Sequence, residues 1–464
     1  MKLRRTAPSA AVLAAALALA ACASLAPSHE RPAAPIAERF PLTPAGETGA
    51  PATEHPWRDF FGGDERLRRL IELALANNRD LRIAVLNIEA ARAQAGVVQA
   101  DRWPTVNVAV TGNRLPSAEG ADISSLYTAG LSVTAFELDL FGRVRSAGDA
   151  ALARLSASES ARQAAHIALV ASVASQHVAL AADESLIALT RRTLESRQES
   201  LRLLELRYRY GTASEVDLRT SQTAVESART ALLQQERQRA LDRNALELLV
   251  GQPLPADLPA PAPFDPQSLT DVPAGLPADV LLERPDVRQA EEQLRAAEAN
   301  IGVARAAFFP RITLTGSVGV ASTELSGLFN AGRTAWTFVP QLIAPLFDAG
   351  RNRANLEFTQ AQRDIAVAQY EGAVQSAFRD VADVLAGRAT LGEQVRSARA
   401  LADAEEARFR LIDLRFRNGV AGSLELLDAQ RSLFSAQQQR VAAEAQLLQN
   451  RIAAYRALGG GWAS

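Results

Sequence analysis

The stretch Leu411-Ile-Asp-Leu-Arg-Phe-Arg-Asn-Gly-Val-Ala-Gly-Ser-Leu-Glu-Leu-Leu-Asp428 lies between two long segments with helical periodicity. The Asn-Gly pair at 418–419 is typical of a helix end, and Arg415 would lie in the last turn before it. Ser423 then offers a hydroxyl oxygen as the N-cap of the next helix. The stretch therefore predicts an αα-hairpin, in which one helix ends, the chain turns within about four residues, and a second helix runs back.

A second copy of this hairpin lies earlier in the chain. The segment 203–218 places Gly211 where the later stretch has Gly419, a spacing of 208 residues. Ser214 and Asp217 in the earlier copy have the spacing of a capping box. The chain is therefore predicted to be a tandem duplication, and its function should use two similar hairpins.

Between the helical segments of each repeat, apolar residues alternate with polar or small ones. The apolar members of this pattern are Val106, Val108, Val110, Leu131 and Val133 in the first repeat and Ile312, Leu314, Val318, Val320, Trp336 and Phe338 in the second. Alternation with period two predicts β-strands, and the polar loops within each pattern predict β-hairpins. Each chain is thus expected to supply four strands of about ten residues, a length that crosses an outer membrane when tilted.

Each β-hairpin is followed by a helical segment without proline, at 143–210 and 351–418. About 68 residues at 1.5 Å per residue would span roughly 100 Å. The returning helices at 214–250 and 423–458 are shorter, and so are the single helices expected before the strands, at about 65–102 and 284–308. Two short helices stacked end to end would therefore match one long one. The helices are rich in Ala, Ser, Gln, Glu and Arg, which suits a wall with water on both faces. The alternative, a soluble coiled coil, leaves the β-hairpins unexplained.

Four strands cannot close a barrel, and open strand edges are not tolerated in hydrocarbon. Several chains must therefore contribute to one cylinder. Geometry allows two, three or four copies, and we favour three because twelve strands leave a bore. The predicted fold is mainly α with a membrane β-barrel: a tandem-repeat α-barrel plus four strands per protomer of a shared twelve-stranded barrel.

The N-terminus is typical of a bacterial lipoprotein. Three positive charges precede an apolar run from Ala10 to Ala21, which is too short for a spanning helix and leads to Cys22, the only cysteine. We expect a signal peptide at 1–21 and a lipid anchor on Cys22; the alternative is an ordinary secretory signal with an incidental cysteine. Removal of the signal peptide would change the formal charge of the chain from −2 to −5, which is not the charge of a typical nucleic-acid-binding protein.

The remaining boundaries follow from proline content and periodicity. Residues 22–64 are rich in proline and alanine and predict an extended, lipidated tether. The first repeat covers 65–250, a proline-rich linker covers 251–283, the second repeat covers 284–458, and 459–464 form a C-terminal tail. Outside the N-terminus no stretch approaches 18 continuous apolar residues, so no further transmembrane helix is expected.

Several motifs lie at the ends of these segments. They are Trp57-x-x-Phe-Phe-Gly62, Leu70-Ile-x-x-Ala-Leu-x-Asn-Asn-x-Asp-Leu81, Gly275-Leu-Pro-Ala-Asp-Val-Leu-Leu-Glu-Arg-Pro-Asp-Val287, Phe309-Pro310, Leu426-Leu-Asp-Ala-Gln-Arg431 and Ala457-Leu-Gly-Gly-Gly-Trp462. With them, essentially the whole mature chain resembles the outer-membrane efflux channels, TolC-like proteins and in particular the OprM and NodT type lipoproteins that serve RND pumps. The resemblance implies a homotrimer with an outer-membrane barrel and a periplasmic α-barrel. It also implies a periplasmic adaptor and an RND inner-membrane transporter as partners, for a passive conduit of drugs and toxic compounds.

In this family the periplasmic end is closed at rest by rings of side chains at the hairpin tips. By match, Asp428 takes the position of the constricting aspartate, Leu424 forms an apolar ring one turn earlier, and Glu425 is a second acidic position. Three copies of Asp428 around a narrow axis would repel one another, raise their pKa and favour cations. The alternative is that both carboxylates are solvated helix residues near arginines such as Arg431. Thr220 stands opposite Asp428 in the first repeat, so only the second hairpin supplies that carboxylate.

The hairpin tips also resemble the family's adaptor-contact segments. The matching residues are Arg207, Tyr208 and Gly211 in the first repeat and Arg415, Phe416 and Gly419 in the second. The alternative is that the arginines only cap the C-termini of the long helices, and the two interpretations are compatible.

No enzymatic activity, metal site or cofactor is predicted. His166 and His177 would lie about 16 Å apart along one helix, too far to share a metal ion. The other two histidines lie in the tether, and no phosphate-binding glycine loop precedes a helix. Besides an efflux channel, a periplasm-spanning structural lipoprotein without a pore and a type I secretion channel remain as alternatives. The sequence does not specify the transported compound.

Overall fold

A computed structural model describes residues 24–41, 56–116, 123–259, 278–330 and 333–460. The chain divides into two compact units. The first comprises Met1–Ala33, Leu86–Ser160 and Arg288–Gly372, and the second comprises Ala34–Val85, Ala161–Val287 and Ala373–Ser464. The predicted signal peptide and Cys22 lie outside the described residues, as do residues 260–277 of the predicted linker.

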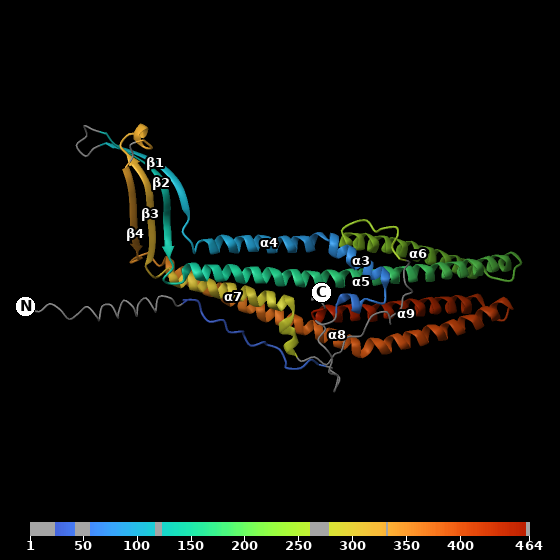
Figure 1. Cartoon of the computed structure of the whole chain (residues 1–464). Coiled ribbons are helices and arrows are strands. Elements are labelled where there is room, and N and C mark those ends of the chain that lie inside the picture. The colour runs from blue at the N-terminus through green and yellow to red at the C-terminus, as the bar shows by residue number, and fades with distance from the viewer. Residues whose placement is uncertain (1–23, 42–55, 117–122, 260–277, 331–332, 461–464) are drawn as a thin grey trace, which may run out of the picture. The chain divides into compact units, whose positions relative to one another are not determined.

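The elements follow one another in the two-repeat order that the sequence predicts (Figure 1). The helix α2 (Trp57–Phe60) precedes the first repeat, which contains α3 (Glu65–Asn77), α4 (Arg79–Ala100), β1 (Val106–Pro116), β2 (Ile123–Leu138), α5 (Arg143–Arg209) and α6 (Glu215–Val250). The short helix η3 (Ala278–Glu283) lies at the end of the predicted linker, and the second repeat contains α7 (Pro285–Ala306), β3 (Arg311–Ser322), η4 (Leu325–Gly327), β4 (Arg333–Ile343), α8 (Arg351–Arg417) and α9 (Ser423–Ala457). The two long helices, α5 and α8, have 67 residues each, which confirms the predicted pair of long helices with shorter return helices.

One helical segment differs from the prediction. The pattern after residue 64 is interrupted at Asn78, whose extended backbone ends α3. Its side-chain Oδ1 accepts a hydrogen bond from the backbone N–H of Leu81 at 2.9 Å, so the same residue starts α4 as an N-cap. Its Nδ2 donates to the backbone oxygen of Leu249 at 2.9 Å, near the end of α6. Asn78 therefore ends α3 and starts α4, so the first repeat has two short helices where the sequence predicts one.

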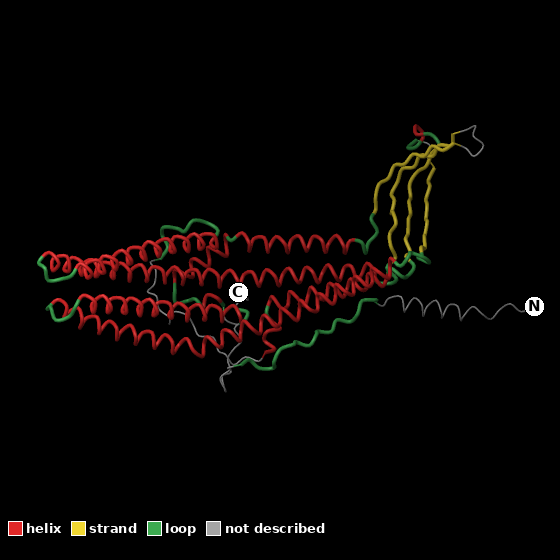
Figure 2. Tube along the Cα trace, turned by 180° about the vertical axis from the view of Figure 1, so that it is seen from behind, coloured by secondary structure: helices red, strands yellow, loops and turns green. Residues whose placement is uncertain are grey.

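In the first unit, the four strands form one antiparallel sheet in sequence order (Figures 1 and 2). The register places a row of apolar side chains across it, namely Val108, Leu131, Val318 and Trp336. Each member of this row is at least half exposed. The row one residue further toward the start of β1 is polar and consists of Asn107, Ser132, Ser317 and Thr337. An exposed apolar face opposite a polar face is the pattern of a membrane barrel wall with lipid on one side and water on the other.

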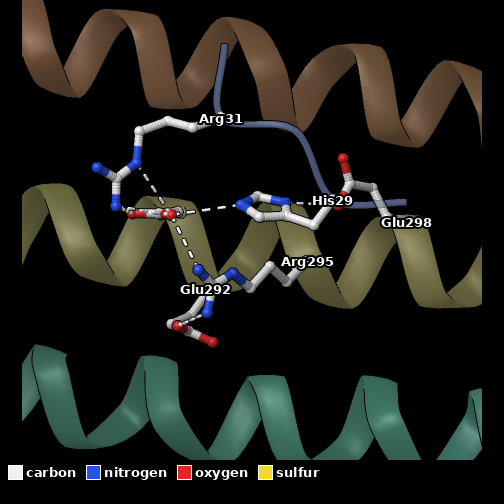
Figure 3. Close-up of polar contacts among 6 residues, drawn as sticks. His29, Arg31, Glu292, Arg295 and Glu298 are labelled. Atoms are coloured by element: carbon white, nitrogen blue, oxygen red, sulfur yellow. Dashed lines mark hydrogen bonds and ion pairs between the residues drawn. The ribbon is translucent and has the colours of Figure 1, made fainter. Parts of the chain in front are cut away.

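Also in the first unit, residues 24–33 of the predicted tether have no helix or strand and lie along α7 (Figure 3). The prediction that the whole segment 22–64 is extended is wrong, because residues 57–60 form the helix α2. Arg31 contacts Glu291 at 2.9 Å, and Arg295 contacts the same carboxylate at 3.1 Å. His29 lies between two carboxylates, with its Nδ1 2.8 Å from Glu298 and its Nε2 3.3 Å from Glu291. Burial opposes ionisation of Glu291, but the hydrogen bonds from Arg31 and His29 hold its pKa below the ordinary value. The tether is therefore fixed to the body by a charged cluster.

The second unit has an aromatic core that joins the Trp57 motif to the end of α9. The rings of Phe60 and Phe61 lie 5.1 and 5.3 Å from the ring of Tyr455. Val170 and Val173 of α5 belong to the same core and are fully buried. α5 contains an 18-residue window of mean hydropathy 1.4, which by length and composition alone could cross a membrane. Half of that window is buried inside the protein, so we assign it to the core.

Candidate gate and tip site

The two hairpin tips turn at the predicted glycines. Gly211 and Gly419 have φ angles of +73° and +74°, in the left-handed region that glycine adopts without strain. A Cβ added at either position would meet no atom within 4 Å. The turns therefore depend on backbone conformation alone, and their outer surfaces are open.

The predicted cap of the first return helix is confirmed, whereas that of the second is wrong. Ser214 and Asp217 form the capping box at the start of α6. At α9 the N-cap is Gly422, which has no side chain to accept a hydrogen bond, and Ser423 is already the first helical residue. The Ser423 hydroxyl instead donates to the Asp217 carboxylate of the other hairpin. Asp217 thus caps its own helix and also binds the second tip.

A second contact between the hairpins is centred on Phe416. Arg207 of α5 donates to the backbone oxygen of Phe416 at 2.7 Å, and its guanidinium carbon lies 4.3 Å from the centre of the Phe416 ring. Arg207 thus satisfies a carbonyl at the end of α8, in the other hairpin, rather than one of its own helix. The Phe416 side chain is only 2% exposed and packs with Ile412 and Leu426. The ring of Phe416 therefore lies in the core of the tip, and the predicted contact of this residue with the adaptor stays a prediction.

The two predicted gate carboxylates are both paired with arginines. Asp428 is bound by Arg408 at 2.6 Å and by Arg431 at 2.7 Å. Glu425 is bound by Arg415 at 3.1 Å. The hydrogen bond from Arg408 is the largest influence on Asp428 and lowers its pKa. The raised pKa expected for three copies of Asp428 around one axis stays a prediction, since it concerns the assembled copies.

Two of the three predicted constriction residues share a groove with Thr220, which occupies the position of Asp428 in the first repeat. Leu424, Asp428 and Thr220 line a groove of about 860 Å³ formed by α6, α9 and one residue of α5, Arg197. Leu424 is 75% exposed. Glu425 is not among the lining residues. The arrangement offers an apolar ring position and an ionic position on one face, one helical turn apart.

Sequence reasoning missed Arg408 and Arg197. Arg408 lies 11 residues before Gly419 and Asp428 lies nine residues after it. Residues at similar distances from a hairpin turn face each other, so the predicted turn contained the signal for the Arg408–Asp428 pair. Arg197 belongs to the first hairpin and α9 to the second, so distance from a turn gives no signal that the two lie together.

The sequence pattern of one protein family, outer membrane efflux protein, matches residues 70–252 and 276–460, which together include both repeats. The toluene efflux pump outer membrane protein TtgI of Pseudomonas putida is 46% identical over 456 residues, covering 96% of this chain and 97% of that protein. Outer membrane protein OprJ of Pseudomonas aeruginosa is 44% identical, covering 99% and 97%. The open state of the MtrE outer membrane channel of Neisseria gonorrhoeae superimposes with a TM-score of 0.85 at 40% identity, covering 95% of this chain and 98% of that one.

The predicted resemblance is therefore confirmed over nearly the whole length, in both sequence and fold. The chain belongs to the outer membrane efflux protein family.

Proposed function

We propose that three copies of this chain form a channel through which a tripartite efflux system passes small organic compounds out of the cell. As an outer membrane efflux protein, the chain lies in the outer membrane and extends into the periplasm. Its partners in this role are a periplasmic adaptor and an inner-membrane transporter of the RND class. The transporter supplies the energy, and the channel is a passive conduit.

The four-stranded sheet carries this proposal. One face presents the apolar row described above, and β1 and β4 are its two edges. In hydrocarbon, the unpaired N–H and C=O groups of an edge strand are costly, so each edge needs a strand from another copy. Three copies bring twelve strands, which close around a water-filled bore.

Small apolar or amphiphilic organic compounds are the proposed cargo. Relatives similar along the whole chain are named for the efflux of toluene and of antibiotics. The type I secretion alternative, in which the cargo is a protein, has no support of this kind.

Two measurements on the purified full-length lipoprotein test the channel. We expect a trimer by mass measurement in detergent and discrete conductance steps in planar lipid bilayers. A single chain that passes no ions would refute the channel. A trimer that passes no ions would favour the periplasm-spanning structural lipoprotein.

Leu424 and Asp428 are proposed to form the resting gate, with Glu425 as a second acidic position. Both gate residues line one groove at the tip, and Leu424 is largely exposed in the single chain. A bulky apolar side chain exposed so close to an ionic one is consistent with burial against copies of itself around an axis.

Asp428→Ala tests the gate, because it removes the carboxylate that Arg408 and Arg431 hold. We expect a higher single-channel conductance than that of the wild type. Glu226→Ala is the matched control, since Glu226 is an exposed carboxylate paired with an arginine on α6 outside the groove. An Asp428→Ala conductance no higher than wild type would count against the gate.

The tip residues Arg207, Tyr208, Gly211, Arg415 and Gly419 are proposed to contact the adaptor. The open space around both glycines supports this, because a partner can approach the turn closely. Gly211→Ala or Gly419→Ala should reduce crosslinking to the adaptor in cells. Unchanged crosslinking and efflux in both variants would contradict the contact.

Cys22 is proposed to carry the lipid that anchors the tether to the outer membrane. It lies two residues before the first described residue, and Arg31 and His29 fix the following segment to α7. Mass spectrometry of the mature N-terminal peptide should find a diacylated cysteine, and an unmodified one would refute the anchor.

A further inference from the structure

Arg197 is a buried cation in the wall of the tip groove. It projects from α5 between α6 and α9 and is 8% exposed. One guanidinium nitrogen donates to the backbone oxygen of Ala224 at 2.9 Å, and the group lies 5.7 Å from the centre of the Phe434 ring. Its Nε is buried without a hydrogen-bond partner in the described structure. The guanidinium therefore has unused donor capacity.

No carboxylate within the described part of the chain balances this charge. Burial alone lowers the pKa of the Arg197 guanidinium, with no opposing contribution from an acidic neighbour. The two carboxylates in the groove have their own arginines: Glu215 pairs with Arg219, and Asp428 pairs with Arg408 and Arg431. A buried charge without a counter-charge is costly, and the cost is relieved when an anion binds.

Beside its charged and hydroxyl side chains, the groove has an apolar part and is roomy. The apolar part is formed by Val216, Ala224, Leu424 and Leu427, and Val216 and Leu424 are each 75% exposed. A volume of about 860 Å³ is in the range of sites for drug-sized molecules. A simple inorganic anion would use the charge but leave this apolar surface in water.

We propose that the groove between α6 and α9 binds an amphiphilic organic anion, a carboxylate or sulfonate whose acid group pairs with Arg197 and whose apolar body covers Val216 and Leu427. The site recognises one chemical class of compound, next to the residues of the candidate gate. It rests on the proposed function only in that such compounds reach the groove through the channel.

The test is calorimetric titration of the intact trimer in lipid nanodiscs with 4-butylbenzenesulfonate. The matched cationic probe is 4-butylphenyltrimethylammonium, which has a similar apolar part and the opposite charge. We expect saturable binding of the sulfonate and none of the ammonium compound. Arg197→Gln should weaken sulfonate binding at least about tenfold, because it removes a charge-assisted hydrogen bond. Arg197→Lys should retain most of it.

Arg202→Gln is the control for charge on the same helix, because Arg202 is exposed, pairs with Glu199 and lies outside the groove. It should bind the sulfonate as the wild type does. Ligand binding also stabilises the folded state, so the sulfonate should raise the melting temperature of the wild type and of Arg202→Gln but not that of Arg197→Gln. This second readout separates loss of the site from loss of folding.

Equal sulfonate affinity in Arg197→Gln and wild type would overturn the inference. Absence of sulfonate binding to the wild type would also overturn it, and would indicate that a carboxylate of another copy occupies Arg197 in the trimer. Conductance of the same preparations keeps the two proposals apart. A channel that conducts without binding the sulfonate refutes the site alone, whereas a protein that binds it without conducting refutes the channel.

Discussion

Asp183 should make the stability of the second unit depend on pH. Its side chain, on α5, is 8% exposed and hydrogen-bonds to Asp242 of α6. Two carboxyl groups form a hydrogen bond only if one of them keeps its proton. Burial, followed by the interaction with Asp242, raises the pKa of Asp183 from 3.8 to about 7, although Arg239 opposes the shift.

The sign follows from the protons bound in each state. Between pH 3.8 and about 7 the folded chain keeps the Asp183 proton and the unfolded chain has lost it, so stability falls as the pH rises. The contribution is complete below pH 3.8 and absent above about pH 7. Raising the Asp183 pKa by about three changes the free energy of unfolding by roughly 4 kcal/mol, at 1.36 kcal/mol for each pKa unit. This is an upper limit, because relaxation of the site would reduce it.

Asp183→Asn removes this titration, because an amide donates to the Asp242 carboxylate at every pH. Near pH 5 the variant should be about as stable as the wild type. Near pH 8 it should be more stable, by about 2–4 kcal/mol. Glu195→Gln is the matched control, because it removes the same charge from an exposed position of the same helix that does not contribute to the pKa of Asp183.

Melting temperatures of the purified lipoprotein in detergent, followed by circular dichroism at pH 5, 6, 7 and 8, measure this effect. The difference between variant and wild type matters, since other groups titrate equally in both. A melting temperature of Asp183→Asn that exceeds that of the wild type progressively from pH 5 to pH 8 supports the reasoning. Parallel curves for the wild type, Asp183→Asn and Glu195→Gln would refute it.

Two further predictions concern contacts between distant segments. Arg207→Ala should weaken the association of the two hairpin tips by about 1–3 kcal/mol, because it removes a charged hydrogen bond to the Phe416 carbonyl. Chymotrypsin should then cleave faster near the tips. Arg209→Ala, in the same helical turn, should leave the cleavage rate unchanged. Glu291→Gln should release the tether, so that trypsin removes the N-terminal segment about tenfold faster. Glu292→Gln, which keeps the Glu291 carboxylate, should be cleaved at the wild-type rate. Equal cleavage rates for the two variants would contradict the role of Glu291 in holding the tether.

The elements were predictable because their signals are local. Helical periodicity and the left-handed glycines, Gly211 and Gly419, set the hairpins, and alternation with period two set the strands. The break at Asn78 was missed because asparagine is tolerated within a helix pattern. Its extended backbone and its cap on Leu81 break the helix, and its contact with Leu249, 171 residues away, has no local signal.

The site was predictable in position but not in its ion pairs. Matching to a family placed Leu424 and Asp428 at the tip, and the structure brings them into one groove. The lowered pKa of Asp428 in the single chain was not predictable, because the sequence argument considered only the copies of Asp428 and not Arg408, across the hairpin. The burial of Phe416 was missed for a similar reason, since an aromatic residue beside a turn gives no sign of whether it faces solvent or a second hairpin.

The contacts at the tip fall into two classes, and their different strengths indicate how it can move. The Arg207–Phe416 contact and the Asp217–Ser423 hydrogen bond join the two hairpins of one chain around a buried ring, so separating them exposes apolar surface. The pairs of Asp428 with its arginines are partly exposed, and exposed ion pairs contribute only about 0–1 kcal/mol each. Exchange of ionic partners therefore costs much less free energy than separation of the hairpins.

We expect the two hairpins of a chain to move together when the channel opens, with the Asp428 carboxylate changing partners while the Phe416 cluster stays intact. Disulfide crosslinks between α5 and α8 within one chain, near Arg207 and Phe416, should then leave conductance unchanged, and a crosslink that abolishes opening would disprove this order of strengths.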